Sequence, residues 1–89
     1  MKFEWDPRKA TASVRKHGVS FDEAMTVFSD WESVTIPDPD HSEGEERFVI
    51  VGFSSRRRFL VVSHAERGEN VRIISARRAD AGERRKYGK

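Results

Sequence analysis

The chain contains no cysteine and no long apolar run. Without cysteine it can form neither a disulfide framework nor a thiolate metal site, and it has no thiol nucleophile. The N-terminal stretch MKFEWDPRK lacks the apolar core of a signal peptide, and no segment approaches the length needed to cross a bilayer. We therefore expect a cytoplasmic protein that has no membrane partner.

Apolar residues are also scarce, at 36%, and charged residues are equally abundant, at 36%. A chain of 89 residues is expected to form one domain, residues 1–89. A domain this small buries a modest fraction of its surface, so its stability margin is thin. We expect an oligomer or a complex that covers more apolar surface, although the composition does not require one.

The charges are unevenly distributed, although the net charge is only +2. Residues 1–46 hold five Lys/Arg and eleven Asp/Glu, a balance of −6, whereas residues 47–89 hold twelve and four, a balance of +8. Such asymmetry points to a nucleic-acid surface in the basic half. The alternative is that the two halves pair with each other in the fold.

The first part of the chain predicts a strand and a helix. Polar and apolar residues alternate from Lys2 to Trp5, as in a short strand. Asp6 is a good N-cap, and proline suits the first helical position, so a helix begins at Pro7. Gly18 is expected to end this helix in the left-handed conformation.

A second helix begins after Ser20. The motif SFDE is a capping box, with Ser20 at the N-cap and Glu23 three residues later. An apolar stripe at helical spacing then predicts the face that enters the core: Phe21, Ala24, Met25 and Phe28.

The remainder predicts a sheet. SVTIP, RFVIVGFS, RFLVVSHAE and NVRIISAR read as strands, and the last three are joined by turns short enough for antiparallel hairpins. The motif DAGE, with Asp80 and Glu83, is a capping box that opens a short helix through Tyr87. The fold class is α+β: an N-terminal strand and two helices, an antiparallel four-strand meander, and a short C-terminal helix.

Metal binding is not expected. The acidic loop has alternating Asp38, Asp40 and Ser42, but Gly44 lies one position late for a calcium loop and Val49 replaces its glutamate. The histidines do not have metal-ligand spacing. His64 has two readings, a hydrogen-bonded histidine of the sheet or a site residue beside the arginine-rich strand.

The stretch VRIISARRADAGERRKY holds six cationic side chains. Strict alternation sends Arg77 and Arg78 to opposite faces of the strand, with Ile73 and Ser75 on the face of Arg77. Arg84 and Tyr87 are three residues apart and share one helix face. If the helix packs beside the strand end, one of the two strand arginines joins them.

Such a patch suits RNA cleavage without a metal. A base takes the proton of the 2′-hydroxyl, which attacks the phosphorus, and an acid protonates the leaving 5′-oxygen. Arginines stabilise the phosphorane, as bidentate donors that stay charged. Tyrosine can stack on a base or assist proton transfer.

Four stretches resemble the BrnT family of ribonuclease toxins from bacterial type II toxin–antitoxin systems: FEWDPRKA, RKHGVSFDEA, PDPDHSEGEERF and IISARRADAGERRKY. The resemblance runs from Phe3 to Tyr87. It implies a RelE-like fold and a metal-independent endoribonuclease, without cofactor, that cleaves RNA and stops translation. It also implies a cognate BrnA-like antitoxin, a homodimer within the complex, and contact with operator DNA only through the antitoxin.

The resemblance also suggests site residues. Arg77 and Arg84 match its motif as phosphate and transition-state ligands, and Tyr87 as a stacking or proton-transfer group, with His64 as a further catalytic candidate. The expected RNA-binding residues are Arg67, Arg72, Arg78, Arg85 and Lys86.

Two other readings stay open. The basic face could bind nucleic acid without cutting it, which predicts a steep salt dependence and intact RNA. Alternatively, it could serve only to meet an acidic partner.

Overall fold

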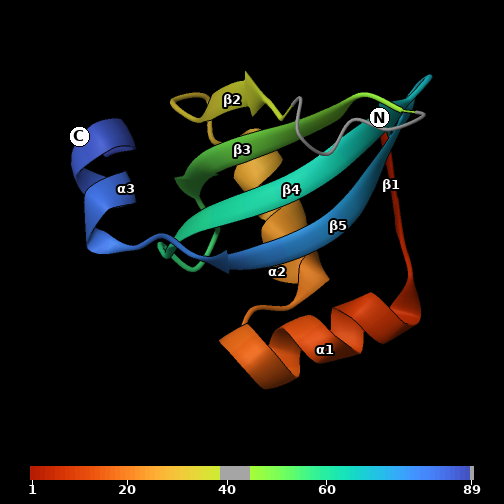
Figure 1. Cartoon of the computed structure of the whole chain (residues 1–89), viewed down its shortest axis with the longest axis horizontal. Coiled ribbons are helices and arrows are strands. Elements are labelled where there is room, and N and C mark those ends of the chain that lie inside the picture. Colours follow the sequence, from red (N-terminus) through yellow and green to blue (C-terminus); the bar gives the residue numbers. More distant parts are fainter. Residues whose placement is uncertain (39–44, 89) are drawn as a thin grey trace.

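The computed structural model describes residues 1–38 and 45–88 (Figure 1). The element order agrees with the predicted one, and the second helix continues as a short 3-10 segment, η1. The elements are β1 (Lys2–Trp5), α1 (Pro7–His17), α2 (Phe21–Thr26), η1 (Val27–Ser29), β2 (Val34–Pro37), β3 (Arg47–Phe53), β4 (Phe59–Arg67), β5 (Asn70–Arg78) and α3 (Ala81–Tyr87).

The strands form one five-stranded sheet in the order β1-β5-β4-β3-β2. Strands β2 to β5 pair antiparallel with their neighbours in sequence. Strand β1 pairs parallel with β5, from Lys2 opposite Asn70 to Trp5 opposite Ile73. The partner of β1 could not be read from the sequence, because this pair joins segments at opposite ends of the chain.

Both ends of α1 and the start of α3 form as predicted. The Asp6 carboxylate accepts a hydrogen bond from the Arg8 amide at 2.8 Å, and Gly18 adopts a φ of 67° at the end of α1. At α3, the Asp80 carboxylate accepts from the Glu83 amide and the Glu83 carboxylate from the Asp80 amide, so this capping box is complete. These caps satisfy backbone donors that the first helical turn leaves free.

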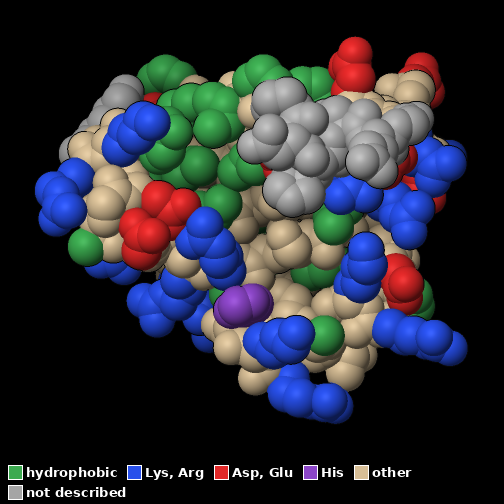
Figure 2. Space-filling view, in the orientation of Figure 1, with side chains coloured by type: hydrophobic (Ala, Val, Ile, Leu, Met, Phe, Trp, Pro, Cys, Tyr) green, Lys and Arg blue, Asp and Glu red, His purple; other side chains and the backbone are tan. Residues whose placement is uncertain are grey.

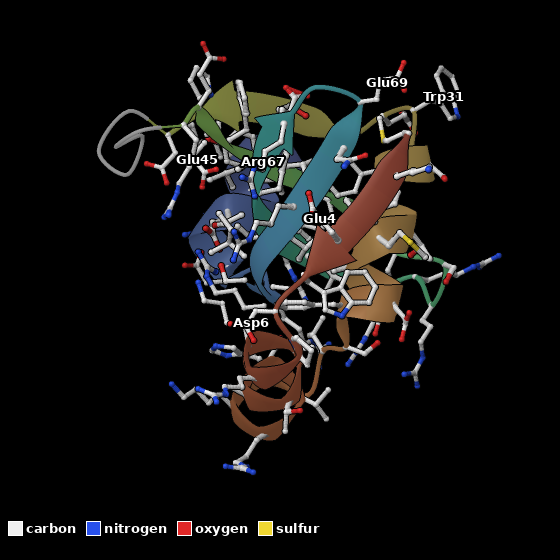
Figure 3. The ribbon with its side chains drawn as sticks, turned by 90° about the vertical axis from the view of Figure 1, so that its right-hand side faces the viewer. Glu4, Asp6, Trp31, Glu45, Arg67 and Glu69 are labelled. Atoms are coloured by element: carbon white, nitrogen blue, oxygen red, sulfur yellow. The ribbon has the colours of Figure 1, made fainter. Side chains whose placement is uncertain are left out.

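The larger core lies between the sheet and the helices α1 and α2. Phe21 and Ala24 are buried, and Met25 and Phe28 pack against the same cluster, so the predicted apolar stripe is confirmed. The opposite face of the sheet carries a smaller cluster, where Tyr87 of α3 packs. Figure 3 shows α3 on one side of the sheet and α2 on the other. The smaller cluster consists of Val51, Phe59, Val61 and Ala79, with Val49 and Tyr87 packed against it.

A β-bulge breaks the alternation that the sequence predicted for β5. The register between β4 and β5 shifts at Ser63 and His64. As a result Ile73 and Ala76 both enter the larger core, whereas strict alternation placed them on opposite faces. The prediction that Ile73 shares a face with Arg77 is therefore wrong, because a bulge inserts one extra residue into a strand.

Gly52 lets the segment after η1 approach the sheet closely. A Cβ atom at this position would lie 2.8 Å from the Ser33 Cβ and 2.9 Å from an Asp30 carboxylate oxygen. The same Asp30 carboxylate accepts a hydrogen bond from the Phe53 amide at 2.8 Å. The end of β3 is thereby fixed against the segment after η1.

No helix within the described residues has the length and apolar character needed to span a bilayer.

Candidate functional site

A cavity of about 480 Å³ opens between α3 and the end of the sheet where β3 and β5 finish and β4 begins. Of the eight described residues that line it, five are arginines and none is acidic. We call it the arginine cavity. Its lining residues are Phe53, Arg57, Arg58, Phe59, Arg78, Arg84, Arg85 and Gly88.

Two phenylalanines separate the arginine cavity from a smaller hollow. The ring centroids of Phe53 and Phe59 lie 4.8 Å apart, and both rings line both spaces. The smaller hollow is completed by Asp30, Glu32 and Tyr87. Cations thus lie on one side of the aromatic pair and carboxylates on the other.

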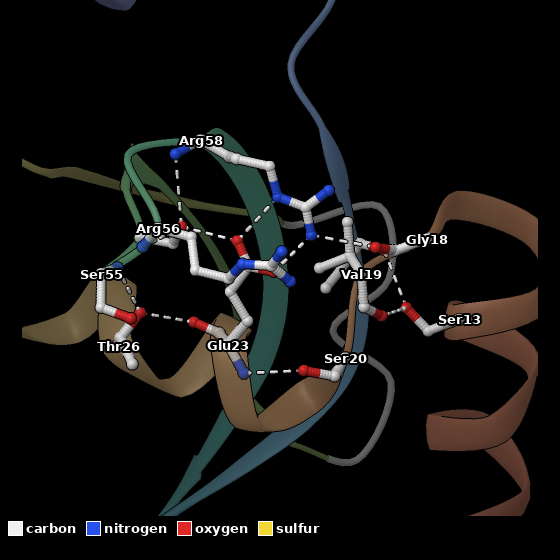
Figure 4. Close-up of polar contacts among 11 residues, drawn as sticks. Ser13, Gly18, Val19, Ser20, Glu23, Thr26, Ser55, Arg56 and Arg58 are labelled. Carbon is white, nitrogen blue, oxygen red and sulfur yellow. Dashed lines mark hydrogen bonds and ion pairs between the residues drawn. The ribbon is translucent and has the colours of Figure 1, made fainter.

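The turn between β3 and β4 brings two of the arginines to the cavity. The Ser55 amide donates a hydrogen bond to the Thr26 hydroxyl at 2.8 Å, which ties the turn to α2 (Figure 4). Arg57 has a φ of 61°, in the left-handed region. That conformation costs a non-glycine residue about 1–2 kcal/mol, so a strained cationic residue lies at the cavity rim.

Arg58 is held from behind by a buried carboxylate. Its guanidinium donates to Glu23 through Nε at 2.9 Å and through Nη2, and Nη2 also donates to the Gly18 carbonyl at 2.9 Å (Figure 4). The Ser54 hydroxyl donates to the same carboxylate at 2.6 Å. The hydrogen bond from Arg58 lowers the pKa of Glu23, although burial opposes the shift. This carboxylate therefore stays charged and fixes Arg58.

The same contact corrects one local prediction. Ser20 accepts a hydrogen bond from the Glu23 amide at 3.0 Å, as the motif SFDE predicted. The Glu23 side chain, however, binds Arg58 and Ser54 instead of returning to the N-cap. Half of the predicted capping box forms, because a guanidinium binds a carboxylate more strongly than a backbone amide does.

Arg78, and not Arg77, joins Arg84 at the cavity. Arg77 forms a two-pronged ion pair with Glu83 of α3, at 2.7 and 2.8 Å. The pair raises the pKa of Arg77 and lowers that of Glu83 to about 2. Asp80 caps α3, and Glu83 in the first turn of that helix meets Arg77 of β5. In this conformation Arg77 fastens α3 to the sheet.

Tyr87 also holds α3 in place. Its half-buried ring packs against the smaller core cluster, and the Lys86 ammonium lies 5.3 Å from the ring centroid. Tyr87 lines the smaller hollow, whereas Arg84 and Arg85 line the arginine cavity. Arg84 and Tyr87, which we expected to lie together, therefore line different spaces, with the phenylalanine pair between them.

His64 lies inside the larger core and not at the cavity. Its side chain is 2% exposed, with ring centroids 4.8 Å from Phe28 and 5.8 Å from Phe48. Burial lowers the pKa of His64. A ring enclosed in this way does not touch a substrate, so the structure favours a histidine of the sheet interior over the expected catalytic one.

The expected RNA-binding residues fall into two groups. Arg78 and Arg85 line the arginine cavity, and Lys86 lies on the same helix as Arg85. Arg67 and Arg72 lie toward the opposite end of the β4–β5 ladder, about 20 Å away at roughly 3.3 Å per residue. Arg67 there faces Glu45 at 3.9 Å (Figure 3). Arg67 and Arg72 therefore do not belong to the cavity.

No three His, Cys, Asp or Glu side chains within residues 1–38 and 45–88 are grouped so as to hold a metal ion. Asp40, Ser42 and Gly44 of the acidic loop lie outside the described residues.

A family model described as "Ribonuclease toxin, BrnT, of type II toxin-antitoxin system" matches residues 5–83. The chain belongs to the BrnT family. The resemblance seen in the sequence is thereby confirmed, and with it membership of a family of ribonuclease toxins. A family of this type implies an antitoxin partner. No curated protein matches the chain.

Among solved structures, the chain is similar to the Brucella abortus ribonuclease toxin BrnT, whose crystal structure has 1.1 Å resolution. The TM-score is 0.71 at 23% sequence identity, and the match covers 90% of this chain and 97% of that one. At this identity the likeness shows a common α+β fold.

The BrnT family match covers only part of the arginine cavity. Phe53, Arg57, Arg58, Phe59 and Arg78 lie within residues 5–83, whereas the other three lining residues, Arg84, Arg85 and Gly88, follow the matched range. Arg57 and Arg58 were not among the predicted site residues, because their segment reads as a turn. The signal that could have found them was the run of three arginines, Arg56 to Arg58, directly after an apolar strand.

The pair between Arg77 and Glu83 gives a first prediction for this BrnT-family chain. The pKa of Glu83 falls from an ordinary 4.5 to about 2, with the Arg77 hydrogen bond as the largest cause. Because the folded pKa is lowered, the stabilisation is present above about pH 4.5 and is lost as the pH falls toward 2. Carboxyl NMR of the wild type should show Glu83 titrating near pH 2, and Arg77→Ala should shift that titration upward. Equal titration in both proteins would contradict the pair.

Proposed function

We propose that this chain is an endoribonuclease toxin that cleaves RNA at the arginine cavity, without a metal ion, and so inhibits translation. The observation that carries the proposal is the cavity itself. Among the described residues, Arg57, Arg78, Arg84 and Arg85 line it without a carboxylate partner. Unpaired guanidiniums facing one space favour a phosphate ligand.

The proposed reaction is attack of a ribose 2′-oxygen on the adjacent phosphorus. The P–O2′ bond forms and the P–O5′ bond breaks. The proton of the 2′-hydroxyl goes to a base, and another proton reaches the leaving 5′-oxygen. The products are a 2′,3′-cyclic phosphate and a 5′-hydroxyl. Arg78 and Arg84 would stabilise the additional negative charge on the phosphorane.

Membership of a type II toxin–antitoxin family supports an antitoxin partner. We propose that a BrnA-like antitoxin neutralises the toxin, that two toxin chains meet in the complex, and that operator DNA is bound only through the antitoxin. A RelE-like variant of the α+β fold and a cytoplasmic location belong to the same proposal.

A second candidate function is binding of RNA without cleavage. It is favoured by the lining of the arginine cavity, whose described residues include no histidine, tyrosine or carboxylate to act as a general base. Asp30, Glu32 and Tyr87 line the adjoining hollow, beyond the phenylalanine pair.

The test is incubation of purified protein with a single-stranded RNA, with and without chelator. We expect chelator-resistant cleavage that leaves 2′,3′-cyclic phosphate ends, and none at a position carrying a 2′-deoxyribose. Intact RNA together with salt-dependent binding would instead support the binding function.

The same assay decides what Arg77 does. If Arg77 acts by fastening α3, Arg77→Ala and Glu83→Gln should reduce cleavage by similar factors, because both break one ion pair. A much larger loss in Arg77→Ala would restore it as a phosphate ligand. Tyr87→Phe tests in the same assay whether the Tyr87 hydroxyl takes part in cleavage, since this variant keeps the packing ring and removes only the hydroxyl.

A further inference from the structure

Phe53 is an exposed aromatic residue at the junction of the two spaces. It ends β3, it is 49% exposed, and it lines both the arginine cavity and the smaller hollow. Figure 2 shows that apolar side chains gather over β2 and β3 on this face, next to the cations of α3. An exposed phenyl ring beside several guanidiniums is suited to bind a ligand that has both a flat ring and a negative charge.

The ring is held firmly from behind. Its centroid lies 4.8 Å from that of Phe59, at an interplanar angle of 54°, and Phe59 is only 8% exposed. The Phe53 amide donates to the Asp30 carboxylate at 2.8 Å, and Gly52 packs against Ser33 with no room for a side chain. A ring held in this way loses little conformational freedom when a ligand stacks on it.

The charges around Phe53 would orient a bound nucleotide. Arg57, Arg78 and Arg84 lie on the side of the arginine cavity, and Asp30 and Glu32 line the hollow on the other side. A phosphate is attracted to the first side and repelled from the second. A nucleotide bound here would place its phosphate among the arginines and its base on the phenyl ring.

We propose that Phe53 is the stacking platform for one unstacked base of single-stranded RNA. This inference rests on the proposed function and specifies its substrate class. Aromatic side chains bind single strands by stacking, which every base supports, while cations follow the backbone. A duplex keeps its bases stacked on each other, so it presents no free base face to the ring. The site should therefore select single strands.

In this proposal Phe53, and not Tyr87, stacks on the base, although the family resemblance suggested Tyr87 as a stacking or proton-transfer group. Tyr87 packs onto the smaller core cluster and contacts Lys86, so its ring already holds α3. Phe53 has the more exposed ring, and it alone of the two lines the arginine cavity.

The test measures binding separately from cleavage. The ligand is a fluorescent 2′-O-methyl RNA oligomer, which cannot be cleaved by 2′-hydroxyl attack, beside the same oligomer with abasic positions and its duplex form. Fluorescence anisotropy should show tighter binding of the base-bearing single strand. Phe53→Leu should weaken that binding by roughly 5- to 150-fold, and Phe53→Trp should retain it.

The controls separate stacking from charge and from folding. Val34→Ala removes another exposed apolar side chain, 37% exposed, from β2 and should leave binding unchanged. Arg84→Ala should lower the slope of log affinity against log salt by about 0.7, whereas Phe53→Leu should leave the slope unchanged. Thermal unfolding must show that each variant is folded. If Phe53→Leu does not fold, the comparison of Phe53→Trp with the wild type still tests the inference.

Three results would overturn the inference. Equal affinity of wild type and Phe53→Leu would mean that the ring carries no base, even if RNA is cleaved. Equal affinity for abasic and base-bearing strands would also mean that the ring binds no base. It would indicate that Phe53 contacts a side chain of a protein partner instead. If the wild type binds none of the oligomers, the proposed function fails together with the inference.

Discussion

Replacing Arg78 with alanine is expected to reduce RNA cleavage by about 10²- to 10³-fold, the usual cost of losing one donor to the developing charge of a transition state. Arg78 lines the cavity beside Arg84, and no ion pair occupies it among the described residues. The effect should appear in kcat and in kcat/KM alike, since the interaction strengthens in the transition state. Single-turnover cleavage of one RNA by both proteins measures it.

The matched control is Arg72→Ala on the same strand. Arg72 lies opposite Ala65, far along the ladder from Arg78, which lies opposite Leu60. It should change cleavage by less than about threefold at moderate salt, because it supplies at most a distant attraction for RNA. Arg78→Lys is a sharper variant, since it keeps the charge and loses the two-pronged donor geometry. If Arg72→Ala and Arg78→Ala cut activity equally, the cavity is not the reaction site.

Replacing Glu23 with alanine is expected to lower the free energy of unfolding by about 3 kcal/mol, near the low end for breaking a buried ion pair. The Glu23 side chain is 3% exposed, whereas that of Arg58 is 22% exposed and keeps some contact with solvent. The variant also removes the acceptor of the Ser54 hydroxyl. Urea unfolding of both proteins gives the difference, with the slope m expected to be unchanged.

The pH dependence of this loss has a definite sign. The pKa of Glu23 is lowered in the folded chain by Arg58, so its stabilisation is present above the ordinary carboxyl pKa and is lost as the pH falls. The difference in free energy of unfolding between wild type and Glu23→Ala should therefore shrink in acid.

The control for the size of the loss is Glu45→Ala, which removes two longer contacts, to Arg47 and Arg67, at 3.8 and 3.9 Å. Such long, solvent-accessible pairs contribute about 1 kcal/mol or less, and a Glu23→Ala loss no larger than this would contradict the buried network.

A double variant shows how much of the effect belongs to the ion pair. Glu23→Ala and Arg58→Ala should be strongly non-additive, because each removes the same contact. Arg58→Ala should also weaken RNA binding, since this side chain lines the cavity. Glu23→Ala should weaken it less, because the cation stays in the chain and loses only its fixed position.

Local features of the fold could be predicted from the sequence, because they depend on residues within one helical turn or one hairpin. Asp6, Ser20 and Asp80 cap the three α-helices as their motifs indicated. The stripe from Phe21 to Phe28 enters the core as its spacing indicated. The uneven charge pointed to a nucleic-acid surface. The motifs shared with the BrnT family pointed to a ribonuclease toxin, and the family match confirms that membership.

The position of each charged side chain depended on contacts between distant parts of the chain. Glu23 binds Arg58, 35 residues away, although its local motif pointed to the N-cap. Arg77 was the stronger candidate for the cavity by its motif, but Glu83 of α3 engages it and Arg78 takes that place. His64 enters the core, and a bulge beside it changes which residues of β5 share a face.

The sequence by itself thus determined the elements, the N-cap residues of the helices, the basic half and the family. Only the tertiary structure decided which arginines face one cavity, which of them are already paired, and that Phe53 stands exposed beside them. The physical reason is range. Caps and periodicity act over three or four residues, whereas an ion pair or a cavity lining depends on where the packed sheet and helices bring separate segments together.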